Sequence, residues 1–288
     1  MKQGLLMVSA LVLSFGCEKA GKDSSQLADD LPANEVHVLG VGADPKVKLR
    51  YDVPKDSHVV LDMKARMGMS SPAMPQAMNF NVDASMDETC TDVEPSGDMR
   101  FEIKVASVSV DAPGVPSSAA DMVKDAMGNM VYRFRMSPSG KIDDVQVDGL
   151  TGPMAQMGES MKQSLEQFAA PLPDDAVGKG STWKFKRTAE ANGVKMATLA
   201  KFELVDFKDG VATFNVDGRV VAPKQTIEKN GISVELKKMD GTISGTIAND
   251  LHRLAPQGNF KMTIDMTMGA MGKSIGMKMT MDSDITAH

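Results

Sequence analysis

Met262-Thr-Ile-Asp-Met-Thr-Met268 and Met277-Lys-Met-Thr-Met281, separated by the glycine-bearing segment 269–276, form the stretch that decides the fold. In both arms an apolar residue alternates with a polar one, and such alternation places every second side chain on the same face of a β-strand. We therefore predict a β-hairpin whose turn spans residues 269–276 and whose methionines share one face.

The same alternation recurs nearer the N-terminus, in residues 47–51, 59–69 and 101–110. Dipeptides that adopt the positive φ angles of tight hairpins separate further alternating runs. They are Asn192-Gly193, Asp209-Gly210 and Asn230-Gly231. Strands that are apolar on one side only are typical of antiparallel sheets with a solvent-facing side, so the pattern predicts antiparallel meanders.

Two segments have the periodicity of helices instead. Residues 118–128 begin with a near capping box and end at Gly128. Residues 154–168 place apolar side chains along one stripe, namely Met154, Met157, Met161, Leu165 and Phe168. We expect both helices to pack their apolar stripe on a sheet face.

A loose internal repeat divides the chain. Residues 130–142 and 245–260 each place one strand before a Pro-x-Gly turn and another after it. We therefore predict an α+β, mainly antiparallel β fold of two similar curved meander sheets, half-barrel-like, with two helices. The first β-rich half is residues 46–150, the connecting helix lies in 151–174, and the second β-rich half is residues 175–288.

The first seventeen residues have a different character. Lys2 supplies a positive charge, and the apolar stretch from Gly4 to Gly16 is thirteen residues long. A bilayer-spanning helix needs about 20 apolar residues, so this stretch predicts an export signal and not a transmembrane anchor.

Leu13-Ser14-Phe15-Gly16-Cys17 resembles the lipobox of bacterial lipoproteins, with Ser14 in place of the usual leucine. The resemblance implies cleavage between Gly16 and Cys17, with diacylglycerol and an acyl chain such as palmitate on Cys17. The partner is then a membrane, and Glu18 resembles the sorting signal that favours the outer membrane, facing the periplasm. The alternative is an ordinary secretory signal with an incidental cysteine.

After such cleavage the chain keeps 31 basic and 38 acidic residues, a net charge of about −7. This charge argues against nucleic acid as a partner. Residues 18–45 are rich in Lys, Asp, Ser, Ala and Gly and have no sustained period, which predicts a flexible tether between the lipid and the folded body.

Three short segments carry a family resemblance: Lys48-Leu49-Arg50-Tyr51, the run from Pro171 to Trp183 with Val177-Gly178-Lys179-Gly180, and Met266-Thr267-Met268-Gly269. They resemble landmarks of DUF6263, a family of uncharacterised bacterial lipoproteins, over most of residues 46–286. The resemblance implies a fold and no mechanism, because the family has no established activity.

Motifs for catalysis are missing from the sequence, which contains no Gly-x-Ser-x-Gly, His-Glu-x-x-His, phosphate-binding glycine loop or Cys-x-x-Cys. Only His58 and His252 of the four histidines fall within predicted structure, each beside turn-like residues. We therefore predict a non-enzymatic protein with no catalytic residues, no cofactor and no metal site as the leading interpretation.

Cys90 lies in the acidic run 87–98. Neighbouring carboxylates should raise the pKa of its thiol, which argues against a nucleophile. The run lacks the ligand spacing of an EF-hand, so we interpret it as a solvated loop. If Cys17 is acylated, Cys90 is the remaining free thiol, and the fold is held without an intrachain disulfide.

Methionine is the compositional oddity, with 25 residues against one tryptophan, two tyrosines and ten phenylalanines. Met can fill an irregular core in place of Leu and Phe, or it can line a concave sheet face that binds a lipid or another apolar small molecule. The apolar-ligand face predicted on this basis comprises Met63, Met67, Met69, Met262, Met266, Met268, Met277, Met279 and Met281.

Two further interpretations remain open. Thioether clusters, such as Met266, Met268 and Met271 or Met67, Met69, Met74 and Met78, could hold Cu(I), which soft sulfur ligands select. Methionines two apart in one strand lie about 7 Å apart, so a neighbouring strand would have to contribute. Alternatively, the protein is an envelope adaptor that binds another protein, and an exposed apolar patch would favour that role.

Overall fold

The computed structural model describes residues 31–74, 76–113, 121, 124–125, 127–149, 158–165, 169–191, 193–229, 232–270 and 273–288. The predicted signal peptide with Gly16 and Cys17, and residues 18–30 of the predicted tether, lie outside the described residues. So do Met271, Asn192 and the dipeptide Asn230-Gly231.

Thirteen strands form one sheet, in which all named neighbours run antiparallel. The elements are β1 (Val36–Gly40), β2 (His58–Ser70), β3 (Met78–Val93), β4 (Met99–Asp111), β5 (Val131–Met136), β6 (Ile142–Asp148), α3 (Gly158–Leu165), β7 (Thr182–Ala191), β8 (Val194–Lys208), β9 (Val211–Ala222), β10 (Gln225–Lys229), β11 (Ile232–Asp250), β12 (Ala255–Ala270) and β13 (Lys273–Ala287). The order across the sheet is β1-β7-β8-β9-β11-β12-β13-β2-β3-β4-β5-β6, with β10 paired to β11. The predicted, mainly antiparallel β architecture is confirmed.

The prediction of two separate sheets is wrong. Strands β2 to β6 form one meander and β7 to β13 another, but β13 pairs along β2, from Lys278 opposite Ser70 to Ala287 opposite Leu61. This pairing joins two long strands whose backbone groups would otherwise be left unpaired at a sheet edge. The two halves therefore share one continuous sheet and one apolar face.

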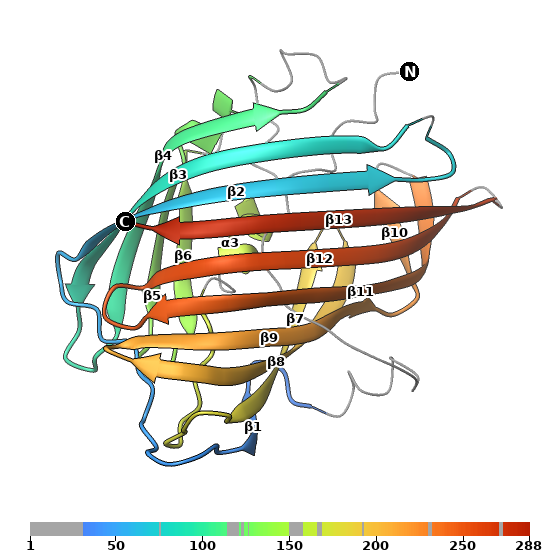
Figure 1. Cartoon of the computed structure of the whole chain (residues 1–288). Helices are drawn as coiled ribbons and strands as arrows, with labels where there is room; N and C mark the ends of the chain where they lie inside the picture. The colour runs from blue at the N-terminus through green and yellow to red at the C-terminus, as the bar shows by residue number, and fades with distance from the viewer. Residues whose placement is uncertain are drawn as a thin grey trace.

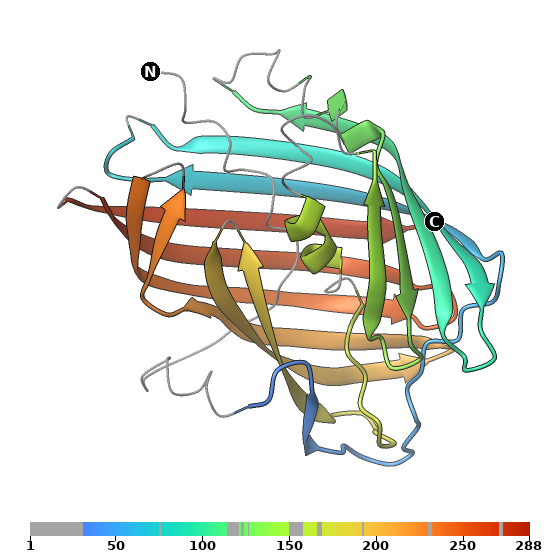
Figure 2. The ribbon, with the colours of Figure 1, turned by 180° about the vertical axis from the view of Figure 1, so that it is seen from behind.

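The sheet is strongly curved. Figure 1 shows its outer side, with the long strands from β9 to β3 stacked across the view. From behind, β5 and β6 at one end of the strand order and β7 at the other turn over the inner side of these strands (Figure 2). Helix α3 lies on this inner side and contacts β6 and β7.

The helical predictions are met only in part. Helix α3 ends at Leu165, and residues 169–174 of the predicted connecting helix are not helical. Of the first predicted helix, residues 121, 124, 125, 127 and 128 are helical, and the others lie outside the described residues.

The main core fills the inner side where α3 and the two ends of the sheet meet. Trp183 of β7 stacks on Phe202 at a centroid distance of 5.7 Å and meets Phe214 edge-on at 5.6 Å. The Trp183 indole Nε1 donates to the Pro171 carbonyl at 2.9 Å. Offset-stacked and edge-on ring pairs add stability beyond their buried area, so the aromatic group anchors β7, β8 and β9 together.

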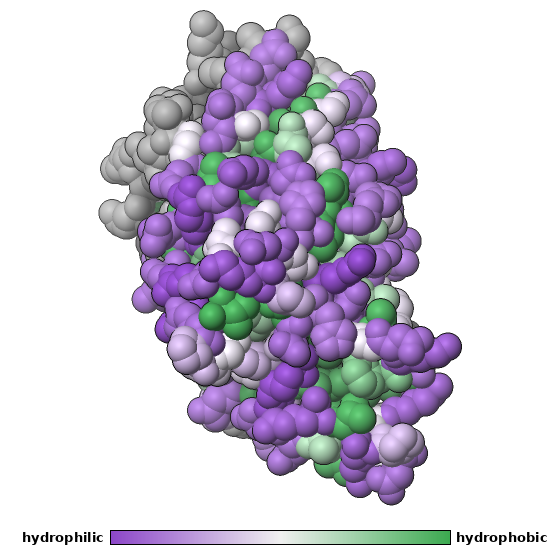
Figure 3. Space-filling model, turned by 90° about the vertical axis from the view of Figure 1, so that its left-hand side faces the viewer, coloured by the Kyte–Doolittle hydropathy of each residue, from purple (hydrophilic) through white to green (hydrophobic). Residues whose placement is uncertain are grey.

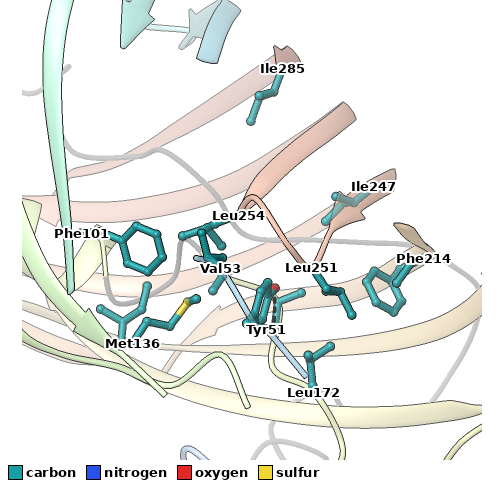
Figure 4. Packing of buried hydrophobic residues seen from close by; sticks show 14 of the residues in the cluster. Tyr51, Val53, Phe101, Met136, Leu172, Phe214, Ile247, Leu251, Leu254 and Ile285 are labelled. Atoms are coloured by element: carbon teal, nitrogen blue, oxygen red, sulfur yellow. Dashed lines mark hydrogen bonds between the residues drawn. The ribbon is translucent and has the colours of Figure 1, made fainter. Parts of the chain in front are cut away.

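The segment between β1 and β2 crosses this core. Leu49, Tyr51 and Val53 are buried, and Figure 4 shows Tyr51 and Val53 among side chains from distant parts of the chain. The predicted strand 47–51 is wrong, because this segment belongs to no strand of the sheet. Val47 forms an isolated bridge with Val177, and the Tyr51 N–H donates to the Pro138 carbonyl at 2.9 Å. Its alternation arises from contact with the core and not from membership of the sheet.

The flexible-tether prediction is wrong for residues 36–40, which form β1 and pair with β7. The terminal hairpin also differs from its prediction. Its strands continue to Ala270 and from Lys273, so most of the predicted turn 269–276 is paired strand. Between β8 and β9 the predicted tight turn is confirmed, since Asp209 and Gly210 have φ angles of 51° and 81°.

The side of the molecule that lies at the left of Figure 1 is mainly hydrophilic, with hydrophobic residues scattered among hydrophilic ones (Figure 3). Exposed large apolar side chains of the described residues lie in four separate segments: Leu39 and Val41, Val93, Phe207, and Ile275.

Candidate functional site

Nine methionines lie in three cross-strand rows on the inner side of the sheet. In the first row, Met239 of β11 pairs with Met266 of β12, which in turn pairs with Met277 of β13. Directly opposite residues of antiparallel strands have Cβ atoms about 4.5–5.5 Å apart, so the side chains of such a row are neighbours.

The other two rows extend across the seam between the two halves. In the second row, Met279 of β13 pairs with Met69 of β2, which pairs with Met78 of β3. In the third row, Met281 lies between Met262 of β12 and Met67 of β2. Because β13 pairs with β2, methionines far apart in the chain meet on one face.

The rows lie on the same sheet face as the main core. Met262 follows Phe260 by two residues on β12, and Met281 precedes Ile285 by four on β13; Phe260 and Ile285 both belong to the main core. Since side chains two or four positions apart in a strand share a face, the methionines project to the inner side.

Six of these nine methionines belong to a second apolar cluster, separate from the main core. Its buried members are Val220, Leu236, Met239, Ile243, Met262, Ile264 and Met281. Its partly buried members include Met67, Met266, Met268 and Met279. On β12 and β13 the face is therefore buried at Met262 and Met281 and becomes partly accessible at Met266, Met268 and Met279, towards the tip of the terminal hairpin.

Met266 and Met277 also border an open depression at this tip. Polar groups share its lining, among them Ser70, Lys238, Asp265 and Lys278. Asp265 and Lys278 alternate with Met266 and Met277 along β12 and β13 and project to the outer side of the sheet, so this depression does not open over the methionine rows.

Seven of the nine predicted face residues stand in the three rows: Met67, Met69, Met262, Met266, Met277, Met279 and Met281. Met268 lies beyond the rows, opposite Leu236 and Ile275. Met63 pairs with Ala84 and Ile285 and belongs to the main core, so its assignment to a ligand face is not supported by its position.

Met239 was missed from the sequence for a structural reason. The register of β11 against β12 shifts between Leu236 and Lys238, which places Leu236 and Met239 on the same face although they are three residues apart. A β-bulge of this kind breaks the period of two from which the face was predicted. Met78 follows the period and could have been included, since β3 begins with it.

One polar side chain lies between the methionine rows and the main core. Ser283 of β13 is opposite Phe260 and Ala65, and its side chain is buried. Its hydroxyl oxygen has no hydrogen-bond partner among the described residues. Buried hydroxyl groups normally form hydrogen bonds, so Ser283 is an unusual polar side chain on a mostly apolar face.

Further buried polar groups lie deeper in the main core. The Asn249 Nδ2 donates to the Tyr51 hydroxyl at 2.8 Å, and that hydroxyl is 3.3 Å from the Ala170 carbonyl, to which it donates. Glu88 of β3 is only 2% exposed, and its Oε2 has no hydrogen-bond partner among the described residues. Burial raises the pKa of the Glu88 carboxyl well above its usual range, which favours the neutral acid.

The interpretation of residues 87–98 as a solvated loop is wrong. The strand β3 continues to Val93, and Cys90 is buried in the main core. Burial, reinforced by Glu88 and two aspartates, raises the pKa of the Cys90 thiol to about 11. The raised pKa was predicted, but burial is its larger cause, and the thiol is a poor nucleophile.

Within the described ranges, no three His, Cys, Asp or Glu side chains are grouped so that they could hold a metal ion. The same part of the chain has no helix of the length and apolarity needed to cross a membrane.

The fold and the face thus define a single-sheet, mainly antiparallel β protein with a methionine-lined inner side. Residues 154–253 match DUF6263, a family of unknown function. The match includes the landmark from Pro171 to Trp183, whereas Lys48-Leu49-Arg50-Tyr51 and Met266-Thr267-Met268-Gly269 lie outside it.

No curated protein matches the chain. Among solved structures, DynF from the dynemicin biosynthesis pathway of Micromonospora chersina is similar, with 10% identity over 90% of this chain and 92% of that one. The TM-score of 0.21 is too low for this similarity to support an argument about fold or function.

Proposed function

We propose that the protein binds an apolar ligand, such as the acyl chain of a lipid, on the methionine-lined inner face, and that it has no catalytic activity. The observation that carries the proposal is the register of the three methionine rows. They bring thioethers from five neighbouring strands onto one face outside the main core.

Methionine suits such a binding surface. Its side chain is unbranched, flexible and polarizable, so it adapts to ligands of different shape. Apolar binding sites are concave and mostly apolar, with a few polar groups that orient the ligand. The inner face offers these properties between the main core and the hairpin tip.

Anchoring to the outer membrane, on its periplasmic side, is part of the same proposal and is supported by the sequence at Gly16-Cys17. A lipid on Cys17 would hold the protein where acyl chains are available. The intact mass of the membrane-extracted protein tests this part. The expected result is loss of residues 1–16 and a lipid mass on Cys17, and an unmodified Cys17 or a retained signal would contradict it.

A fluorescent fatty acid tests ligand binding. We expect a dansyl-labelled fatty acid to bind the purified protein saturably, with a blue-shifted emission. Met279→Glu places a charge on the apolar face, where charge is costly, and should weaken binding by about tenfold or more. Met279 lies at the centre of the proposed site and is only partly buried, so the variant should still fold.

Thr280→Glu is the matched control. Thr280 is the next residue of β13, is exposed, and projects to the outer side of the sheet. Its substitution adds the same charge to the same strand and should leave binding unchanged. Equal affinities of the two variants, or no saturable binding by the wild type, would overturn the proposal.

A further inference from the structure

We propose that Met239, Met266 and Met277 together bind one soft monovalent metal ion, Cu(I) or its analogue Ag(I). The proposal uses one end of the inner face but does not depend on the binding of an apolar ligand there.

The first row provides the ligand spacing that a single strand cannot. Met266 and Met268 are two residues apart on β12, about 7 Å, which is too far for both sulfur atoms to reach one ion easily. Met266 instead has Met239 directly opposite on one side and Met277 on the other. Cross-strand Cβ separations of about 4.5–5.5 Å lie within the reach of the flexible thioether side chains.

The curvature of the sheet helps the three sulfur atoms to converge. The row lies on the inner side, which is the concave side of the curved sheet in Figure 2, and Met266 lies between Met239 and Met277. An ion above Met266 would therefore be approached from both flanks.

The first row is less buried than the third. Met262 and Met281 of the third row are 5% and 4% exposed and are packed among apolar side chains. In the first row, Met266 and Met277 are only partly buried.

The donor set decides which metal fits. Thioether sulfur is a soft, uncharged ligand, which selects Cu(I) and Ag(I) over the hard ions Mg²⁺ and Ca²⁺. Zinc sites use thiolate, imidazole or carboxylate ligands, and within the described chain no three such side chains are grouped.

Competition with bicinchoninate tests the site on the purified full chain, under anaerobic conditions with Cu(I) supplied as the bicinchoninate complex. We expect the protein to withdraw one Cu(I) per chain. Met239→Leu, Met266→Leu and Met277→Leu should each weaken Cu(I) binding by at least about tenfold, because each removes a direct ligand. Leucine preserves size and apolarity, so these variants should fold like the wild type.

Met63→Leu is the control, because Met63 lies on the same sheet face but in the main core, opposite Ala84 and Ile285. It should bind Cu(I) like the wild type. Failure of the wild type to withdraw Cu(I), or leucine variants that bind like the wild type, would overturn the proposal.

Methyl NMR with Ag(I) gives a second measurement, because a change in folding alone would not produce chemical-shift changes that depend on Ag(I). The ε-methyl resonances of Met239, Met266 and Met277 are identified by their absence from the three leucine variants. One equivalent of Ag(I) should shift these resonances, and shifts confined to other methionines would refute the assignment of the metal site.

The fatty-acid titration separates the two proposals. Met266→Leu should still bind the dansyl-labelled fatty acid but lose the metal, whereas Met279→Glu should lose the fatty acid.

Discussion

Met281, in the last strand of the chain, lies directly opposite Met67 in β2 and belongs to the apolar cluster of the methionine rows. This contact lies on the seam that joins the two meanders into one sheet. Because both side chains face the inner side, the seam and the proposed binding face are made of the same residues.

Truncation of Met281 should therefore destabilise the whole fold. Met281→Ala should lower the free energy of unfolding by about 2–5 kcal/mol, the range for large-to-small changes at buried positions. Met281→Leu keeps the volume and should cost less than about 1.5 kcal/mol. Urea denaturation followed by circular dichroism measures both. A Met281→Ala variant as stable as the exposed-site variant Thr280→Ala would show that the seam contributes little.

Glu88 should make stability fall as pH rises. Burial raises the pKa of its carboxyl in the folded state, so the folded protein holds the proton more tightly than the unfolded chain. The contribution of Glu88 to the free energy of unfolding is fully present below its pKa in the unfolded chain, near 4.5. It is lost as the pH rises from there through the pKa of Glu88 in the folded protein. Glu88→Gln imitates the neutral acid, removes this slope and should be more stable than the wild type at pH 8.

Glu102→Gln should change the pH dependence of stability in the opposite direction in the same experiment. A hydrogen bond from Lys104 lowers the pKa of the Glu102 carboxyl. Its stabilising effect is present above the unfolded pKa and is lost as pH falls through the folded value. The Gln variant should therefore be destabilised at neutral pH and approach the wild type in acid. If both variants showed the same pH dependence, the burial of Glu88 would be refuted.

Two glycines with similar backbone angles should respond differently to alanine. Gly42 and Gly180 both have positive φ, 71° and 79°, so alanine is strained at either position. A Cβ on Gly42 would lie 2.2 Å from the Gly178 carbonyl oxygen, whereas one on Gly180 would meet nothing within 4 Å. Gly42→Ala should therefore lower the thermal midpoint more than Gly180→Ala does. Equal losses would contradict the close contact of the two loops.

Trp183 should report the folded state of the main core. It is the single tryptophan of the chain, its side chain is fully buried, and its indole N–H is bonded to Pro171. We expect a blue-shifted emission that acrylamide quenches weakly and that moves to the red on unfolding. A red-shifted, readily quenched emission from the native protein would mean that β7 does not pack as described.

The sequence predicted the parts of the fold in which pattern and burial coincide. Residues 59–69 and 101–110 alternate because one side of each strand faces the core, and they lie in β2 and β4. The segment 47–51 also alternates, but its apolar side chains enter the core from outside the sheet. The alternation of apolar and polar residues therefore identified buried side chains correctly, but it identified strands of the sheet less reliably.

The register between distant strands could not be read from local pattern. Pairing of β13 with β2 depends on contacts between opposite ends of the chain, so two sheets were expected where there is one. Met239 was missed because a bulge in β11 interrupts the alternation of its side chains between the two faces of the sheet. Glu88 was taken as solvated from its acidic neighbours, although its two-residue spacing from Cys90 places both side chains on one face.

The glycines of the family landmark have a physical reason that emerges only from the structure. A Cβ on Gly178 would lie 1.7 Å from the Ala43 carbonyl oxygen, so the backbones of two loops touch at this position. The contact positions β1 against β7 and explains why the chain after Val177 needs glycine.

Native mass spectrometry of the purified protein, read before and after denaturation, tests the central claim most directly. Binding of an apolar ligand predicts an extra, lipid-sized mass on the folded protein that disappears on unfolding and is absent from Met279→Glu. A folded wild-type protein that carries only its covalent mass, and gains none when incubated with fatty acid, would contradict the claim and leave the methionine rows as packing.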